Sequence, residues 1–477
     1  MGAQPARHAH AERAAQKKTP VAAQIKFCAV KLSDIQSHGL RLEASVYDLD
    51  AMKVRRDFLK NSVPLSELIS NAYYGGRLKR QYINGKNNQA IGFVGSSEML
   101  DCRPKPVKFM MDSFSVDDLK VTIGSLLISR SGTVGNITFV NKTLSKFLVS
   151  EHAIRLICKD YAGYLYAYLK SKIGQLLIQS NIYGAVIQEI EPEHLENIPV
   201  PVAPESLKRQ IHGLVVRSYE LRDESNELID EAEKILINEL HLPDIDDFER
   251  EKVFSVKLSD LRGRLDASYH LPLVGSIVEH LKAHAAEVTT IADPRISRAV
   301  ILPGRFKRVY VDEGHGRIFI GGKQIGELDP SNKKYLSNIH HADRISAELE
   351  LHENMTLITR SGTIGKVTLV PKHWEDWIAS EHVIRITPAS DDISGYLSLF
   401  LASDCGQVLI KRNTYGAVVD EIDDKQVRVL PVPLLRNVAT QSRINSMVLL
   451  ANEKRFRAYL LEQEALRILN DKILAVQ

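Results

Sequence analysis

Apolar residues recur at alternating intervals of four and three positions between residues 204 and 240. The positions at this spacing are Leu207, Ile211, Leu214, Ser218, Leu221, Ser225, Leu228, Ala232 and Ile235. A sustained heptad seam of this kind is typical of a helix in a coiled coil. We therefore predict one long helix over residues 204–240.

A second stretch, residues 435–477, repeats this spacing near the end of the chain. Its seam consists of Ile444, Met447, Ala451, Lys454, Ala458, Leu461, Ala465 and Ile468. Several alanines and one lysine make this seam less apolar, and the small side chains allow a neighbouring helix to approach closely. We predict a second long helix here.

Short apolar, β-branched runs alternate with glycine-bearing turns elsewhere. Residues 126–128 and 136–140 flank the turn at Ser131-Gly132, which predicts a β-hairpin, and residues 356–358 and 367–370 repeat the pattern. Helical stretches follow at 164–180 and 396–412. Mixed strands and helices of this kind predict an α+β fold.

The chain contains two similar copies of one large unit, in the same order. The second copy repeats seven segments of the first in the same order. The segments at 30–34, 41–45, 76–82, 130–135, 150–152, 183–186 and 199–201 correspond to those at 256–260, 264–268, 304–310, 360–365, 380–382, 415–418 and 431–433. Two copies of a large unit indicate two similar globular domains rather than a solenoid. We place the first copy at 25–203 and the second at 256–434, with a linker at 241–255 and a disordered tail at 1–24.

One long helix follows each copy, so we expect the two helices to pack antiparallel as a coiled coil in a pseudo-two-fold molecule. The globular copies would then lie at opposite ends of the rod. The alternative is that each helix packs on its own copy as an amphipathic surface helix.

Composition narrows the function classes only slightly. The formal net charge is +3, so a nucleic-acid surface must be local rather than general. The four cysteines, Cys28, Cys102, Cys158 and Cys405, are scattered, which argues against a zinc site or a disulfide framework. With no apolar stretch long enough to cross a membrane, we expect a cytoplasmic protein.

Catalytic signatures are missing from the sequence. It contains no phosphate-binding loop, no dinucleotide fingerprint and no Asn-Pro-Pro-Tyr-like tetrapeptide. His340-His341 has no partner at metal-ligand spacing. Glu151-His152 and Glu381-His382 recur with the repeat, and we interpret them as structural polar clusters in preference to an acid–base pair. We predict no catalytic residue and no metal site.

Basic residues near turns are the stronger signal, because lysine and arginine neutralise phosphates and polar side chains on loops bond to base edges. Arginine beside a tight turn can instead cap a carbonyl, which is the alternative for Arg130 and Arg360. The predicted DNA contacts are Arg77, Lys79, Arg80, Lys86, Asn88, Arg130, Ser131, Thr133, Arg305, Lys307, Arg308, Arg317, Lys323, Arg360, Ser361 and Thr363.

The order of these motifs resembles a known family. An ordered set of motifs occurs twice: G-R-[LF]-K-R-x-Y, a run like residues 319–325, R-S-G-T-[VI]-G, and a run like residues 198–201 before a long helix. The arrangement resembles the specificity subunit of type I restriction–modification systems, from about Lys26 to Leu474. One departure is the run at 183–188, where the family often carries a more polar sequence.

This resemblance implies a DNA-binding subunit without catalytic residues or bound cofactors, active in phage defence. Each target-recognition domain would read one half of a split, asymmetric sequence in double-stranded DNA. The paired helices would dock two methyltransferase subunits that use S-adenosylmethionine to methylate adenine. Motor–nuclease subunits that use ATP and Mg²⁺ would join for restriction. The predicted helix interface is Leu207, Ile211, Leu214, Leu221, Leu228, Ile235, Ile444, Met447, Leu461 and Ile468.

The length of the first seam is compatible with this role. From Leu207 to Ile235 a helix extends about 42 Å, or roughly 12 base pairs. Two other classes stay open: a coiled-coil scaffold that binds protein only, and an enzyme built around the recurring Ser-Glu-His.

Overall fold

The computed structural model describes residues 27–475 apart from 28, 38–39, 59–60, 78, 86, 185–186, 246–252, 262 and 417–419. The predicted tail at 1–24, part of the predicted linker and Lys86 lie outside the described residues. The model mixes helices and strands, so the α+β fold class is confirmed.

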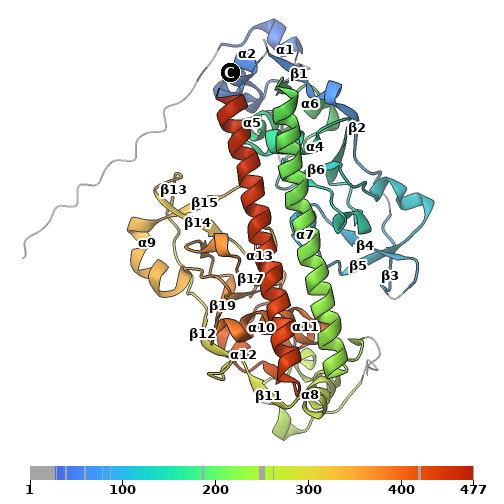
Figure 1. Cartoon of the computed structure of the whole chain (residues 1–477), viewed down its shortest axis with the longest axis vertical. Helices are drawn as coiled ribbons and strands as arrows, with labels where there is room; N and C mark the ends of the chain where they lie inside the picture. The colour runs from blue at the N-terminus through green and yellow to red at the C-terminus, as the bar shows by residue number, and fades with distance from the viewer. Residues whose placement is uncertain are drawn as a thin grey trace, which may run out of the picture.

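Two long helices form the axis of the molecule (Figure 1). Helix α7 spans Glu205–Leu240 and helix α13 spans Val438–Leu469. They lie side by side and run in opposite directions, with Ser218 Oγ donating to Ala458 O at 2.7 Å near the middle. Helix α7 ends at His241, whose φ of 46° is left-handed. The Asn437 side chain caps α13 by accepting from the Thr440 backbone N–H.

The buried face of each long helix is wider than the predicted seam. Ile211, Leu221, Ile444 and Ile468 are buried as expected, whereas Leu207, Leu214, Leu228, Ile235, Met447 and Leu461 are only partly buried. Helix α7 also buries Val215, Tyr219, Ile229 and Leu236, which lie outside the seam. Each helix therefore packs both on the other helix and on the sheets and helices beside it.

The first copy contains three antiparallel or mixed sheets. One has the order β2(Ile69–Tyr73)-β9(Ala153–Cys158)-β6(Leu126–Ser129)-β7(Ile137–Phe139). The next has the order β3(Tyr82–Ile83)-β5(Lys108–Met111)-β4(Ala90–Val94)-β8(Leu148–Val149), in which β4 and β8 are parallel. The third pairs β1(Ser62–Pro64) with β10(Pro199–Pro201).

The second copy has the same three sheets in the same strand orders. They are β12(Ser297–Ile301)-β19(Val383–Pro388)-β16(Thr356–Thr359)-β17(Val367–Leu369), β13(Tyr310–Val311)-β15(Lys334–Ser337)-β14(Gly316–Ile320)-β18(Ile378–Ala379), and β11(Glu287–Thr290)-β20(Pro431–Leu434). The predicted hairpins are confirmed as the antiparallel pairs β6–β7 and β16–β17.

The predicted helical stretches at 164–180 and 396–412 are confirmed, and each is divided into two helices by a short break. The observed elements are α4 (Ala162–Lys170), α5 (Lys172–Gln179), α10 (Asp391–Ala402) and α11 (Asp404–Lys411). Ser171 and Ser403 stand at the breaks, and each side chain accepts from a glycine N–H at the start of the next helix. A Cβ on Gly174 would lie 2.1 Å from Tyr168 O, so the sharp bend requires glycine there.

Shorter helices complete the fold. They are α1 (Leu32–Ser37), α2 (Leu49–Phe58), α3 (Leu65–Leu68), α6 (Pro192–Glu196), α8 (Pro272–His284), α9 (Asn338–Arg344) and α12 (Asp424–Arg428). No single described helix is long and apolar enough to span a membrane; the bent pair α10–α11 reaches that length and composition together.

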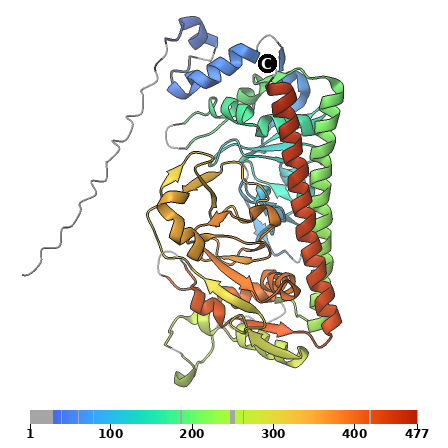
Figure 2. The same cartoon turned by 60° about the vertical axis from the view of Figure 1, so that its left-hand side comes forward.

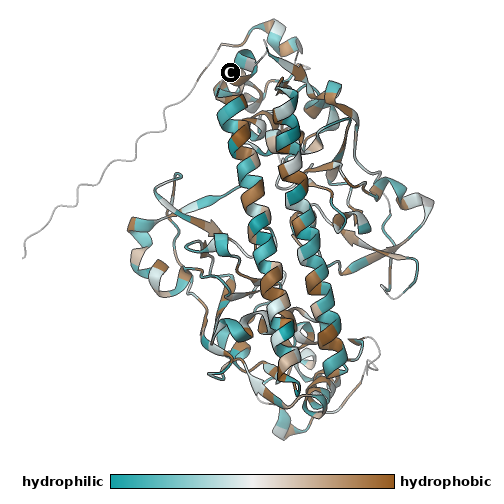
Figure 3. Cartoon of the chain, viewed as in Figure 1, coloured by the Kyte–Doolittle hydropathy of each residue, from teal (hydrophilic) through white to brown (hydrophobic). Residues whose placement is uncertain are grey.

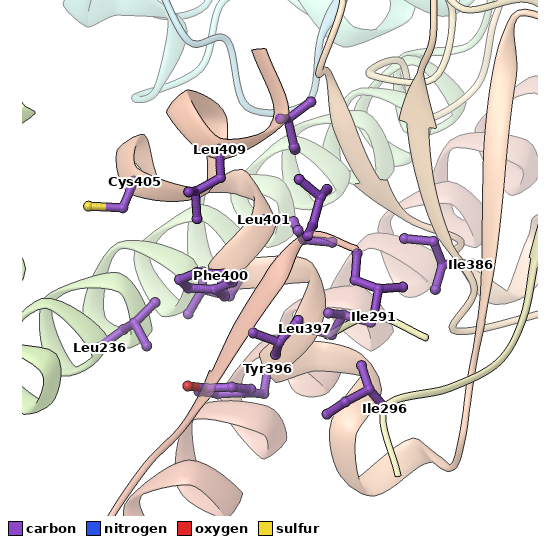
Figure 4. Packing of buried hydrophobic residues seen from close by; sticks show 14 of the residues in the cluster. Leu236, Ile291, Ile296, Ile386, Tyr396, Leu397, Phe400, Leu401, Cys405 and Leu409 are labelled. Atoms are coloured by element: carbon purple, nitrogen blue, oxygen red, sulfur yellow. The ribbon is translucent and has the colours of Figure 1, made fainter. Parts of the chain in front are cut away.

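Two large hydrophobic cores lie near opposite ends of the helix pair. The first joins sheet residues such as Leu126 and Ile154 to Ile211 of α7 and Ile468 of α13. The second joins Leu236 of α7 to Phe400 and other residues of the second copy (Figure 4). Hydrophobic and hydrophilic residues alternate along both long helices (Figure 3), as expected for helices that are covered on some faces only.

The two copies also contact each other between the ends of the rod. Both β-sheet regions lie on one side of the helix pair (Figure 2), and they touch near its middle. Cys102 N donates to Gly326 O at 2.8 Å, and Leu328 of the second copy packs against Leu221 and Ala458. The core of each copy includes residues of both long helices, from opposite ends of the pair.

Candidate nucleic-acid interface

The R-S-G-T turns are built in the same way in both copies. Ser129 Oγ donates to Thr133 O at 2.5 Å and accepts from Asn136 N at 2.9 Å. The hydroxyl of Thr359 makes the equivalent two bonds in the second copy. Gly132 has a φ of 82°, a left-handed conformation that favours glycine, and its neighbour Thr133 is exposed. Gly362 and Thr363 repeat this arrangement, so each turn presents a rigid polar tip.

A histidine is fixed beside each turn by the serine of the motif. Ser131 Oγ lies 2.6 Å from His152 Nδ1, and Ser361 Oγ lies 2.7 Å from His382 Nδ1. Each histidine side chain is 40% exposed, so its other ring nitrogen faces the surface region of the cluster. One nitrogen of each ring is therefore occupied within the protein and the ring orientation is set.

The neighbouring glutamates are engaged by arginine rather than by histidine. Arg80 Nη2 donates to Glu151 Oε1 at 2.6 Å, whereas His152 Nε2 is 3.8 Å from that oxygen. Arg308 Nη2 donates to Glu381 Oε1 at 2.7 Å in the second copy. An orienting carboxylate in a catalytic triad would hydrogen-bond the free ring nitrogen. The geometry therefore favours the interpretation of a structural polar cluster.

The surroundings of Glu151 favour its ionised form. Burial raises the pKa of Glu151, but hydrogen bonds from the backbone and from Arg80 outweigh burial and leave the pKa below its usual value. Arg80 also lies over the Phe93 ring, with 4.9 Å from its guanidinium carbon to the ring centroid. Arg308 lies over Phe319 in the same way at 5.1 Å. The Arg80 and Arg308 side chains are thus each held between a carboxylate and an aromatic ring, and both side chains remain partly exposed.

Two buried arginines that the sequence analysis missed hold the loops under these clusters. Arg155 donates to the carbonyl oxygens of Val149, Ser150, Ala153 and Leu119. Arg385 makes the equivalent four bonds in the second copy. In the sequence, the signal was an arginine within an apolar run, three residues after the histidine of each Glu-His pair.

Arg130 and Arg360 were predicted DNA contacts, and the structure gives them a structural role instead. Arg130 is 4% exposed and its guanidinium donates to both Glu189 and Glu191. Arg360 is paired with Glu421. Moving either side chain to a phosphate would break these ion pairs with partly buried carboxylates. Both arginines therefore hold the turn to the strand-like segment that follows α5 or α11.

The remaining predicted contacts divide by exposure. Arg77, Lys79, Asn88, Thr133, Arg305, Lys307, Lys323 and Thr363 are exposed, while Ser131, Ser361, Arg80 and Arg308 are partly buried in the clusters. Arg317 is also partly buried and is paired with Glu350. Arg305 approaches Glu421 at 3.1 Å but keeps 73% of its side chain exposed, so it stays available to a phosphate.

A cleft of about 1410 Å³ lies between the two copies. Its walls include Arg80 and His152 from the first copy and Arg308, Lys323 and His382 from the second. The two clusters thus border one shared space. Within the described part of the chain, no group of three histidine, cysteine or acidic side chains is arranged to hold a metal ion.

Comparison with known proteins gives structural likeness only. No protein-family model matches the sequence, and no curated protein matches it either. The type I restriction–modification S subunit of M. genitalium is 14% identical, with 86% of this chain and 95% of that chain covered and a TM-score of 0.33. The HsdS subunit of Thermoanaerobacter tengcongensis is also 14% identical, with the same coverage and a TM-score of 0.28.

Another similar structure, from a study of complex assembly in the type I R-M system, is 13% identical and covers 86% of this chain and 96% of that one, with a TM-score of 0.27. These solved structures are named for the same family that the order of motifs resembles. All three TM-scores are below 0.5, so the function proposed next rests on the residues and contacts of this chain.

Proposed function

We propose that this chain is the DNA-binding specificity subunit of a type I restriction–modification complex and that it recognises a bipartite, asymmetric target. The observation that carries the proposal is the duplicated surface cluster: a rigid Gly-Thr tip, a fixed histidine and exposed basic residues, present once in each copy. Exposed arginine and lysine supply phosphate contacts, and polar tips supply contacts to base edges.

The pseudo-two-fold arrangement supports a split target. Proteins with two-fold symmetry contact two half-sites about 34–36 Å, or one helical turn, apart or at multiples of that distance. Helix α7 has 36 residues and is therefore about 54 Å long. The two clusters border one cleft between the copies, so a single duplex can contact both of them. Differences between the exposed residues of the two copies make the target asymmetric.

The proposal also assigns the chemistry to partners. Two adenine methyltransferase subunits would dock on the antiparallel helix pair, acting as a coiled coil, and would bring S-adenosylmethionine. Motor–nuclease subunits would bring ATP and Mg²⁺.

The experiment that tests the proposal is a binding selection on random duplex DNA with the full chain, alone and together with a type I methyltransferase subunit. We expect recovery of two short conserved blocks separated by a fixed gap, and retention that falls steeply as salt rises. Adenine methylation within those blocks should require both proteins.

A protein that retains no duplex DNA at low salt would refute the proposal and favour a protein-binding scaffold. Retention without any sequence preference would reduce it to a nonspecific DNA-binding protein. A Ser131→Ala, Ser361→Ala double variant that loses a hydrolytic activity present in the wild type would favour the enzyme alternative.

A further inference from the structure

Two equivalent loops, residues 95–102 and 321–328, meet near the middle of the helix pair. They are built alike: Glu98 Oε2 accepts from Gly95 N at 2.9 Å, and Gln324 Oε1 accepts from Gly321 N at 3.0 Å. This correspondence makes Asp101 the counterpart of Glu327. The two residues face each other in an isolated antiparallel β-bridge, so the repeat contacts itself across its own pseudo-two-fold axis.

The contact between the loops is close and specific. Cys102 N donates to Gly326 O at 2.8 Å, and Lys366 Nζ donates to Asp101 Oδ1 at 2.7 Å. A Cβ added to Gly326 would lie 2.3 Å from Asp101 Oδ1 and 2.5 Å from Lys366 Nζ. The counterpart of Gly326 in the other loop is Leu100, so the loop itself accommodates a large side chain and only the contact excludes one.

Both loops are also attached to the long helices. Asn226 of α7 donates to Cys102 O at 2.9 Å, and Arg103 pairs with Asp230 at 2.6 Å and Glu233 at 2.7 Å. Leu328, from the other loop, packs on Leu221. The contact therefore fixes each copy both to the rod and to the other copy.

We infer that this contact of loops 95–102 and 321–328, together with the length of the helices, sets the gap between the two recognised half-sites. The inference rests on the function proposed above. Changing the gap by one base pair moves one half-site by about 3.4 Å and turns it by roughly 35° about the duplex axis. A contact made of bonds of 2.7 and 2.8 Å does not survive such a displacement, so the protein discriminates against neighbouring gap lengths.

The contact brings two carboxyl groups, those of Asp101 and Glu327, close to Lys366, so its strength depends on pH. Burial raises the pKa of Asp101, and burial together with Asp101 raises the pKa of Glu327 to about 7. The other charged groups facing this pair are Lys366, Lys170, Asp329 and Glu98. As pH rises through about 7, Glu327 ionises and places a second negative charge beside Asp101, which disfavours the contact.

The test compares gap preference in three variants of the full chain, using a library of the two half-sites separated by different gaps. Lys366→Asn introduces the residue found at the equivalent position, Asn136, and Gly326→Leu introduces the counterpart Leu100. Lys172→Ala is the control, because Lys172 pairs with Glu313 of the other copy at 2.7 Å but is 91% exposed. Hydrogen exchange of the Cys102 amide reports the contact itself, without DNA.

We expect the wild type and Lys172→Ala to prefer one gap. In Lys366→Asn and Gly326→Leu the Cys102 amide should exchange faster, and the preference for that gap over its neighbours should fall by about tenfold, equivalent to 1.4 kcal/mol. Faster exchange with an unchanged gap preference would overturn the inference and leave the helices as the only ruler. A wild type that selects no split sequence would overturn the proposed function as well, whatever the exchange data show.

Discussion

Removing the carboxylate of Glu462 should destabilise the protein more than any surface ion pair does. Glu462 of α13 is fully buried, and it accepts from Tyr166 OH at 2.8 Å and also from Lys170 and Arg222. These three partners come from α4 and α7, so one carboxylate joins the first copy to both long helices. In Glu462→Gln, two buried cations lose their shared anion.

The expected cost follows from two independent estimates. Removing one partner of a buried ion pair costs about 3–5 kcal/mol, because an uncompensated charge stays buried. Separately, contacts with Lys170 and Arg222 outweigh burial and lower the pKa of Glu462 to about 2 from 4.5. A shift of that size corresponds to roughly 3 kcal/mol of stability. Both estimates therefore place the loss near 3 kcal/mol.

The sign of the pH dependence is fixed by the direction of the shift. Since the pKa is lowered in the folded state, the stabilisation is fully present above about pH 4.5 and is lost as pH falls toward 2. The assay is urea unfolding of the wild type and Glu462→Gln between pH 3 and pH 7, followed by circular dichroism. The difference between the two proteins should shrink as pH falls.

The control is Glu453→Gln on the same helix, whose partner Arg457 lies on an exposed face. That variant should lose under about 0.5 kcal/mol at every pH. A loss below about 1 kcal/mol in Glu462→Gln at pH 7, or a difference between wild type and variant that does not change with pH, would refute the reasoning about the buried cluster.

Three further predictions follow from other contacts. Leu221→Asp buries a carboxylate where the helices meet and Leu328 packs, and it should abolish partner assembly and lower the unfolding midpoint; an intact complex by size-exclusion chromatography would contradict this. Arg305→Ala with Lys307→Ala should weaken DNA binding and reduce the slope of log affinity against log salt by about one per lost phosphate contact, while leaving the melting temperature unchanged. Gly406→Ala should destabilise the second copy, because the new Cβ would lie 2.1 Å from Phe400 O at the break between α10 and α11; an unchanged melting temperature would argue against so tight a bend.

Several features were available from the sequence because they depend on neighbours along the chain. The heptad spacing identified both long helices, and the β-branched runs around Ser131-Gly132 identified the hairpin. The order of recurring motifs indicated two similar copies, and the two sets of sheets have the same strand orders. Periodicity and turn chemistry are local properties, so a linear pattern records them.

Other features could be decided only by the folded chain. Arg130 reads as a basic residue beside a turn, and its burial comes from Glu189 and Glu191, about 60 residues later. The break at Ser171 is not marked by a proline, and apolar residues continue on both sides of it.

The contact of Asp101 with Glu327, and of Glu462 with Lys170 and Arg222, joins segments separated by more than 200 residues. The sequence alone indicated the two long helices, the two hairpins and the repeated unit, because their signals lie within each segment. Only the tertiary structure decided which charges are buried and how the two copies meet, because burial and pairing depend on residues that the fold brings together from distant parts of the chain.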